Sequence, residues 1–281
     1  MNEHAAEVEA GARFEFGKNW KRFLQSVNEE RISQAEKSLT EMLELTDLRD
    51  KRFLDIGSGS GLFSLAARRL GAHVHSIDYD PQAVECTMEL KRRYFPSDAD
   101  WTIEEGSVVD KDFVESLGQF DVVYSWGVLH HTGAMWQALE HAELPVKRNG
   151  KLFIAIYNQQ RPWTAVWTLV KRTYNALPRF LRGPFMICVM IPSETRSLAY
   201  ALLKLQPQRY IRTWTRYQTA RGMSRWHDWV DWVGGYPFET AKPEDIFEFY
   251  KKRGFVLTKL ITCGGGLGCN QFVFKKISSR A

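Results

Sequence analysis

The sequence is poor in cysteine and has no long apolar run, and both absences narrow the kinds of protein it can be. It has only four cysteines among 281 residues, and no pair shows the spacing of a metal site or a disulfide framework. The best candidate for a membrane span, FMICVMIP at 185–192, is far too short. The polar, acidic first twenty residues lack the apolar core of a signal peptide. We therefore expect a cytoplasmic protein without a metal ion.

Acidic residues are scarce in one segment of the chain. Between residues 158 and 235 there are 12 Lys and Arg against three Asp and Glu, together with six of the ten tryptophans. A basic and aromatic segment is typical of a cap over a pocket, a contact with anionic lipid or a contact with RNA. We favour the cap, because acidic residues are interspersed at its end, and peripheral membrane contact is the alternative. Nucleic acid is disfavoured, since no RNA-binding module is recognisable.

Outside that segment, strand-like and helix-like patterns alternate. Strands are expected at 52–57, 73–78, 101–107, 120–127 and 150–158, and helices at 61–70, 81–95 and 135–143. This alternation predicts an α/β fold with a doubly wound, mostly parallel sheet. A helix at 242–254 and two strands joined by GGGLGC complete it with an antiparallel hairpin.

We divide the chain accordingly into four parts. They are an N-terminal helical segment (1–48), an α/β core (49–157), a mainly helical insertion after the fifth strand (158–240) and a C-terminal helix with hairpin (241–281). The patterns do not predict an oligomeric state.

The glycine-rich turn FLDIGSGSG after the first strand indicates a ligand site. A dinucleotide fold requires G-x-G-x-x-G, but the third position is Leu62 here, and the Walker pattern requires a lysine that is absent. Instead Asp55 precedes the glycines, and a carboxylate there suits a cationic ligand. Asp78, at the end of the second strand, stands where an acidic side chain grips a ribose. A ribose and a positive charge together describe S-adenosylmethionine.

Four stretches in order, FLDIGSGSG, SIDYDP, EEGSVVD and FDVVYSWGVLHHT, resemble the motifs of class I S-adenosylmethionine-dependent methyltransferases. The resemblance covers about residues 50–158 and is greatest to the quinone-biosynthesis subgroup and its small-molecule relatives. It implies a Rossmann-like methyltransferase fold, the cofactor S-adenosylmethionine and a small-molecule acceptor. The rival hypotheses are a methyltransferase that acts at the membrane surface on a lipid or polyprenyl acceptor, and a cofactor-binding protein without turnover.

The resemblance also implies roles for individual residues. Gly57, Ser58, Gly59 and Gly61 would pass under the methionine part of the cofactor. Asp78 would hold the ribose, Tyr79 would lie against the adenine, and Ser107 and Val108 would cover its other edge. Asp55 would orient the ammonium group, and Trp126, His130 and His131 would form the floor and mouth of the site. In the resembling enzymes an N-terminal helix folds over the cofactor, which makes Phe16, Gly17 and Trp20 candidates for a lid.

The acceptor side is less defined by the sequence. A hydroxyl acceptor requires a base, for which the candidates are His130, His131, Tyr157 and Asp228, whereas a thiolate or an activated carbon requires none. Either histidine can equally cap a helix or fill a polar rim. If the insertion caps the pocket, the acceptor contacts are expected at Arg161, Arg221, Trp226, Asp231, Trp232, Tyr236 and Glu239.

Overall fold

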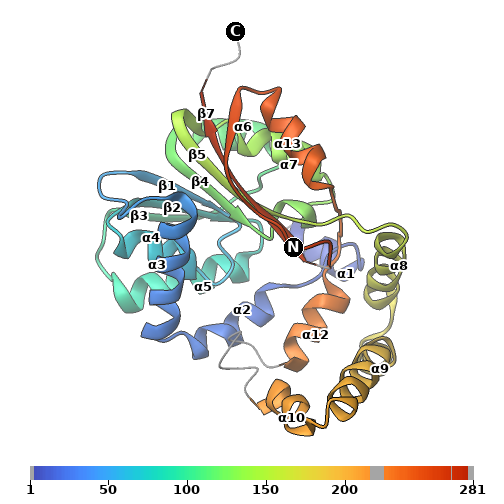
Figure 1. Ribbon diagram of the computed structural model, residues 1–281. Coiled ribbons are helices and arrows are strands. Elements are labelled where there is room, and N and C mark those ends of the chain that lie inside the picture. The colour runs from blue at the N-terminus through green and yellow to red at the C-terminus, as the bar shows by residue number, and fades with distance from the viewer. Residues whose placement is uncertain (1–2, 216–224, 267, 278–281) are drawn as a thin grey trace.

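A seven-stranded sheet forms the centre of the molecule (Figure 1). The computed structural model describes residues 3–215, 225–266 and 268–277. The strands are β1 (Arg52–Ile56), β2 (His73–Asp78), β3 (Trp101–Glu105), β4 (Phe120–Trp126), β5 (Val146–Tyr157), β6 (Phe255–Ile261) and β7 (Cys269–Lys276). Their order is β3-β2-β1-β4-β5-β7-β6. The first five are parallel and β7 is antiparallel to both of its neighbours, which confirms the predicted fold class.

Helices cover both faces of the sheet, as the apolar strands require. One face carries α3 (Glu29–Leu43), α4 (Leu62–Arg69) and α5 (Pro81–Tyr94), and the other carries α6 (Lys111–Ser116), α7 (Met135–Ala142) and α13 (Pro243–Lys251). Successive side chains of a strand point to opposite faces. Phe53 therefore packs into a first core, beneath α3, α4 and α5, and Leu54 packs into a second core, beneath α6, α7 and α13. Both side chains are fully buried. The order of strands reverses between β1 and β4, where doubly wound sheets bind their ligands.

The N-terminal segment, residues 3–26, crosses the carboxyl ends of the strands. It contains α1 (Glu3–Glu9), α2 (Gly17–Phe23) and the short 3-10 helix η1 (Leu24–Ser26). The amide of Gly17 donates a hydrogen bond to Oδ2 of Asp80 at the start of α5, at 2.8 Å. The amide of Phe14 donates to the carbonyl of Tyr236, also at 2.8 Å. The segment is therefore hydrogen-bonded both to the sheet domain and to the insertion.

The insertion is built of helices and extends to one side of the sheet (Figure 1). Its described helices are α8 (Trp163–Ala176), α9 (Arg179–Leu203), α10 (Pro207–Thr215) and α12 (Arg225–Gly234). A third core joins it to the N-terminal segment through Phe14, Tyr174, Met186 and Val233, all of them buried. The insertion thus packs against the part of the chain that covers the ends of the strands.

We predict that Gly17→Ala loosens the N-terminal segment without unfolding the sheet domain. A Cβ atom on Gly17 would lie 2.5 Å from Cβ of Gln82 and 2.6 Å from Oδ2 of Asp80, so α2 must move away from α5. Limited trypsin digestion should cut faster within residues 18–22, with the main thermal transition close to that of the wild type. Gly183→Ala is the matched control, because a Cβ there meets nothing within 4 Å. Equal digestion of both variants would contradict the prediction.

Candidate active site

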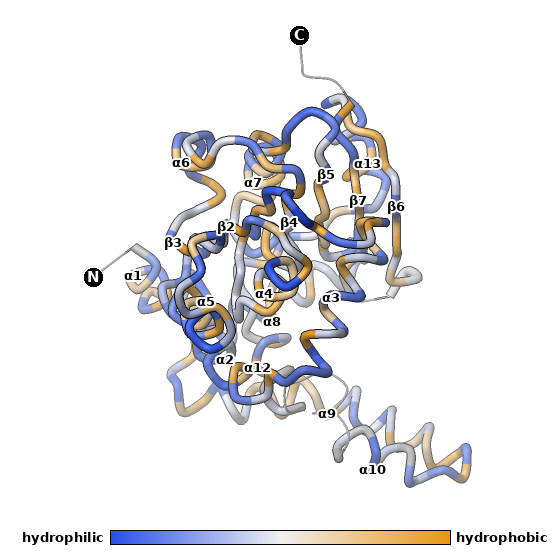
Figure 2. Tube along the Cα trace, turned by 90° about the vertical axis from the view of Figure 1, so that its left-hand side faces the viewer, coloured by the Kyte–Doolittle hydropathy of each residue, from blue (hydrophilic) through white to orange (hydrophobic). Residues whose placement is uncertain are grey.

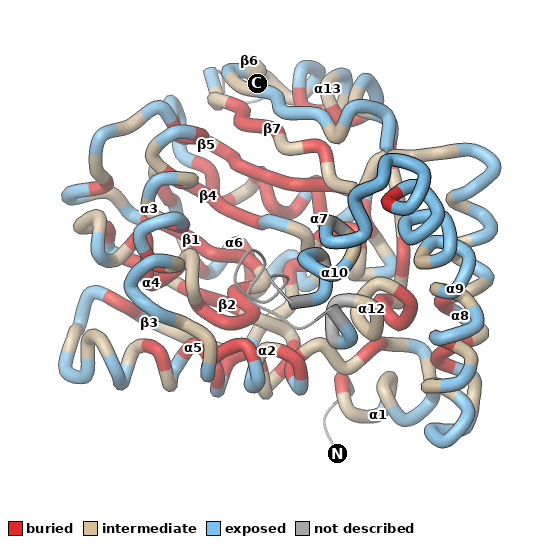
Figure 3. Tube along the Cα trace, turned by 60° about the horizontal axis from the view of Figure 1, so that its bottom comes forward, coloured by how far each residue is buried: buried red, intermediate tan, exposed pale blue. Residues whose placement is uncertain are grey.

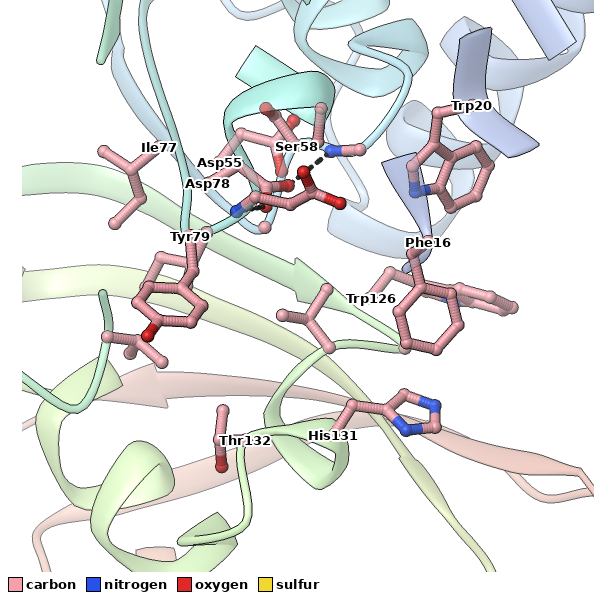
Figure 4. Close-up of a pocket in the computed structure, with 18 of the residues that line it drawn as sticks. Phe16, Trp20, Asp55, Ser58, Ile77, Asp78, Tyr79, Trp126, His131 and Thr132 are labelled. Atoms are coloured by element: carbon pink, nitrogen blue, oxygen red, sulfur yellow. Dashed lines mark hydrogen bonds between the residues drawn. The ribbon is translucent and has the colours of Figure 1, made fainter. Parts of the chain in front are cut away.

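A cavity of about 380 Å³ lies at the carboxyl ends of β1, β2 and β4, beneath the N-terminal segment. Figure 4 shows Asp55, Ser58 and Asp78 grouped on one side of it, with Tyr79 near one end and Phe16, Trp126 and His131 gathered at the other. This volume is in the range of small-molecule sites. Of the residues predicted to bind the cofactor, all but Gly61 line this cavity. The lining residues are Trp20, Asp55, Gly57, Ser58, Gly59, Asp78, Tyr79, Ser107, Val108 and Trp126.

The glycines of the turn between β1 and α4 are needed for close approach. Gly57, Gly59 and Gly61 have φ angles of 77°, 56° and 77°, in the left-handed region that favours glycine. A Cβ atom on Gly57 would lie 2.4 Å from Val128, and one on Gly59 would lie 3.0 Å from the Trp20 indole. Gly61 instead faces Thr87 of α5 at 2.9 Å. Gly61 therefore serves helix packing, while the other two let the backbone border the cavity.

Asp78 is held in place by backbone amides at the end of β2. Gly59 donates to its Oδ2 at 2.8 Å and Asp80 donates to its Oδ1 at 2.9 Å. Burial nevertheless raises the pKa of Asp78 to about 6. The carboxylate thus links the glycine turn to β2 and faces the cavity with its charge incompletely compensated.

Asp55 is the second buried carboxyl group, with 2% of its surface exposed. The hydroxyl of Ser64 donates to its Oδ2 at 2.5 Å, and Ser64 also shares a hydrogen bond with Ser76. Burial, and then the charge of Asp78, raise the pKa of Asp55 to about 7. A positively charged ligand would stabilise both carboxylates, because opposite charge favours the ionised form.

The Tyr79 end of the cavity includes two residues that the sequence did not reveal. The guanidinium of Arg13 lies 4.9 Å from the centre of the Tyr79 ring and donates to the carbonyl of His131 at 3.1 Å. His4 contacts the Tyr79 ring edge-on, with ring centres 5.5 Å apart. Both come from the N-terminal segment, where no motif marked them. An aromatic wall with a cationic cover suits a planar, electron-rich ring.

Tyr124, in β4, is a further lining residue that was missed. Its hydroxyl is buried and has no hydrogen-bond partner among the described residues. An unpaired buried hydroxyl is costly, and a polar group of a ligand in the cavity would supply its partner. The only available signal was its position in the strand, two residues before Trp126.

The two histidines after β4 have different environments. His131, in the 3-10 helix η2 (Leu129–His131), lines the cavity, and its Nδ1 lies 2.6 Å from the carbonyl oxygen of Pro237. Since a carbonyl only accepts, Nδ1 carries the proton and Nε2 is free to accept; no described residue bonds to Nε2. Burial, with the charge of Lys171 next in importance, lowers the pKa of His131 to about 3. The imidazole is therefore neutral at physiological pH.

His130 is fully buried and does not line the cavity. Its Nδ1 accepts a long hydrogen bond from the amide of Tyr157, at 3.4 Å, and its ring packs 4.1 Å from the Tyr157 ring. Burial lowers its pKa well below the usual value. Tyr157 also lies outside the cavity wall, between His130 and Trp232. These positions give both residues a packing role and offer no contact with a ligand in the cavity.

The described residues expected to contact an acceptor do not line this cavity. Arg161 and Trp226 are exposed on the insertion. Asp231 accepts a hydrogen bond from Asn19 of α2, and the Tyr236 carbonyl receives the Phe14 amide. Glu239 accepts from the amide of Met135 at 2.9 Å and so caps α7. Arg221 lies outside the described residues, as does the side chain of Asp228.

Lys171 is an unexpected buried cation at the base of the insertion. It is fully buried, its Nζ donates to the carbonyl of Trp232, and the same atom lies 5.0 Å from the Trp232 ring and 4.8 Å from the Phe238 ring. Trp232 therefore serves to hold this lysine. Burial lowers the pKa of Lys171 to about 7.

Among the described residues, no group of three or more His, Cys, Asp or Glu side chains could hold a metal ion.

We predict that the stability of the wild type relative to Lys171→Met rises with pH. Between pH 7 and 9 the unfolded chain keeps a proton on this lysine that the folded chain has lost, so raising the pH favours folding. The gain should be about 2 kcal/mol over that interval, measured by urea unfolding at both pH values. Lys147→Met, at an exposed lysine that pairs with the partly buried Asp121, is the control. A difference between wild type and Lys171→Met that is constant with pH would show that the lysine is charged in the folded state.

Known proteins match this chain at the level of family and fold. A family model described as "Methyltransferase domain" matches residues 27–231. The ribosomal protein L11 methyltransferase of Methylococcus capsulatus is 40% identical over 73 residues, which cover 26% of this chain and 25% of that protein. The tRNA U34 carboxymethyltransferase of Pseudomonas aeruginosa is 34% identical over 110 residues, 38% of this chain and 33% of that protein. The chain thus spans about a quarter to a third of these curated relatives.

Two solved structures share the fold over most of the chain. The magnesium protoporphyrin IX methyltransferase of Synechocystis, solved with bound S-adenosylhomocysteine, has a TM-score of 0.54 and 12% identity, covering 92% of this chain and 93% of its own. An O-methyltransferase family protein of Burkholderia thailandensis has a TM-score of 0.53 and 12% identity, covering 89% and 58%. The finer resemblance to the quinone-biosynthesis subgroup stays a prediction.

The cavity fits the cofactor of this family. Two buried carboxyl groups suit a ligand with a ribose and a positive charge, Tyr79 offers a ring, and the Tyr124 hydroxyl lacks a protein partner within the described part of the chain. The family model covers well over half of the sequence. The chain belongs to the methyltransferase-domain family, and its cofactor is S-adenosylmethionine.

Proposed function

We propose that this chain transfers a methyl group from S-adenosylmethionine to a small-molecule acceptor that presents an O–H or N–H group to His131. The observation that carries the proposal is the neutral imidazole on the cavity wall, with Nδ1 engaged by the Pro237 carbonyl. Its Nε2 is then a fixed hydrogen-bond acceptor. The small-molecule class is supported by the enclosed position of this atom, beside Phe16 of the N-terminal segment (ring centres 5.0 Å apart).

Five residues would hold the cofactor. Asp78 would accept hydrogen bonds from the ribose, and Tyr79 with Val108 would enclose the adenine. Asp55 and the unpaired hydroxyl of Tyr124 would face the amino acid end, where a cation relieves the cost of burying a carboxylate. When bound, S-adenosylmethionine supplies a methyl group on a positively charged sulfur.

His131 would act by orientation. Its pKa is about 3, which makes it a poor general base at neutral pH, because an effective base has its pKa near the working pH. A hydrogen bond to Nε2 would instead turn a lone pair of the acceptor atom toward the methyl group. The methylated atom would then lose its proton to solvent water, and S-adenosylhomocysteine would leave as the second product. Correct alignment accounts for a large part of the rate in such displacements. Exclusion of water by Phe16, Trp20 and Trp126, which line the cavity, would add to it.

The proposal is tested first by the ligand and the product. Mass spectrometry of the purified protein should detect retained S-adenosylmethionine or S-adenosylhomocysteine. An acceptor screen that measures release of S-adenosylhomocysteine should then favour compounds with a hydroxyl or amine over matched compounds in which that group is already methylated. Cofactor binding with no turnover on any acceptor would favour the rival hypothesis, a binding protein.

We predict that His131→Ala lowers kcat by about 10²-fold, as expected for a misaligned acceptor, while the Kd for S-adenosylhomocysteine changes less than about twofold. In the wild type, kcat should show no histidine titration between pH 5 and 8, because His131 stays neutral there. Steady-state kinetics and calorimetry give the two quantities. His75→Ala, at a partly buried histidine paired with Glu104 in the sheet, is the control. A kcat that falls with a pKa between 6 and 7 would instead identify His131 as a titrating base.

We predict that cofactor binding weakens as the pH falls below about 6. Binding requires Asp78 to be ionised, and its pKa is raised to about 6, so the Kd for S-adenosylhomocysteine should rise by about tenfold per pH unit well below that value. Asp78→Asn should weaken binding at pH 8 by about 1.5–3 kcal/mol and make the pH dependence shallower. Calorimetry at several pH values measures both effects. Asp110→Asn, which retains the cap of α6, should bind as the wild type does. A Kd independent of pH would exclude Asp78 as the ribose ligand.

A further inference from the structure

The outer side of α9 carries an apolar stripe in two parts. We call these residues the α9 stripe; they are Phe180, Pro184, Ile187, Ile191, Leu198 and Leu202, all exposed. Within each part the spacing follows the three- and four-residue steps that place side chains on one side of a helix, and the polar Glu194 and Thr195 stand between the parts. The stripe spans about 33 Å at 1.5 Å per residue. Phe180 is 77% exposed and Ile191 is 50% exposed, so the stripe is largely open within the described chain.

The other side of α9 already has partners. Phe185, Met186, Val189 and Met190 pack into the third core with residues of α8, α12 and the N-terminal segment. The helix is therefore apolar on two opposite sides, one buried by the insertion and one open. A helix with apolar residues all round is normally buried. Isolated exposed apolar residues are ordinary, but a row along a whole helix indicates a surface that is covered in use.

The surroundings of the stripe are positively charged. From α9 through α10, residues 179–215 include six basic residues and one acidic residue. Among the basic ones, Arg179, Arg196, Lys204 and Arg212 are exposed. The single acidic residue, Glu194, accepts a hydrogen bond from the Tyr210 hydroxyl at 2.9 Å. Figure 2 shows α9 and α10 projecting from the body of the molecule, and Figure 3 shows them mostly exposed.

These properties favour one occupant over another. A second copy of the chain would bring two positively charged helices together, and like charges in an interface are repulsive. An anionic lipid surface has the opposite sign, and it accepts an apolar helix face between its headgroups. A projecting helix also suits a flat surface better than a groove. None of the described helices is long and apolar enough to cross a membrane, so the contact would lie in the surface plane.

We propose that the α9 stripe docks this protein onto the surface of a bilayer that contains anionic lipid. The apolar side chains enter the region between headgroup and acyl chain, and the exposed basic residues of α9 and α10 add electrostatic attraction to the anionic surface. The inference does not rest on the acceptor proposed above, because it concerns a face built by α9 and α10 and not the cavity. Docking would bring the enzyme close to acceptors dissolved in the membrane.

The test is co-sedimentation of the full chain with vesicles. Wild type should bind vesicles of phosphatidylcholine with about 30% phosphatidylglycerol and should bind phosphatidylcholine alone much more weakly. Binding should fall when salt is raised from about 0.1 M to about 0.5 M, because screening weakens the charge contribution. The double variant Ile187→Glu/Ile191→Glu should lose binding by at least about tenfold, through the lost burial of two apolar side chains.

The matched control is Ile261→Glu, which introduces the same change at a 45% exposed isoleucine on the edge strand β6. It should bind vesicles as the wild type does. Circular dichroism and S-adenosylhomocysteine binding confirm that each variant is folded. Absence of wild-type binding, or equal binding by the stripe variant, would overturn the proposal. A wild-type dimer that the stripe variant splits, with no vesicle binding, would also overturn it and identify the stripe as an interface between copies.

Discussion

The structure depends on a pair of carboxyl groups buried together at the point where the sheet reverses its strand order. Asp55 ends β1 and Asp78 ends β2, and burial raises the pKa of both. The protein compensates each partly, through the Ser64 hydroxyl at one and two backbone amides at the other. The remaining cost is relieved only by a ligand with a positive charge and hydrogen-bond donors. That requirement explains why the glycine turn and the N-terminal segment both border this pair.

The N-terminal segment is one element through which the insertion acts on the site. Asn19 donates to Asp231 of α12, and Phe14 enters the third core with Tyr174 and Val233. The insertion therefore does not form the wall of the cavity in its described part; it supports the segment that does. The insertion acts on the site in two ways: it supports residues such as Phe16 and Trp20 of the N-terminal segment, and its Pro237 carbonyl accepts the hydrogen bond from Nδ1 of His131. The third core also connects α9 to the N-terminal segment that covers the site, because Met186 of α9 and Phe14 of that segment belong to it.

Burial keeps His131 neutral. Burial lowers the pKa of both histidines most, and the nearby Lys171 contributes to both shifts, with Arg13 a smaller contributor at His131. The Pro237 carbonyl fixes the proton on Nδ1. A neutral acceptor atom is thereby presented to the cavity over a wide pH range. Since the cofactor is itself cationic, a neutral imidazole beside it also avoids repulsion between like charges.

The sequence by itself determined the α/β class, the succession of strands and helices along the chain, and many of the residues that line the cavity. Strand and helix patterns are local, and the motif residues follow strand ends, so the residues and the resemblance together indicated Asp55, Gly59, Asp78 and Trp126. It could not determine the acceptor side. Arg13 reaches the cavity from a segment without a motif, and Tyr124 lies within the fourth motif but had no role assigned to it. His130, Tyr157 and Glu239 have chemically suitable side chains that packing turns to structural use. Tertiary structure decided these roles. A polar side chain contacts a ligand or a neighbouring backbone according to which distant residues pack beside it. Glu239 with Met135 and Arg13 with His131 are examples, since each pair is more than 100 positions apart in the sequence.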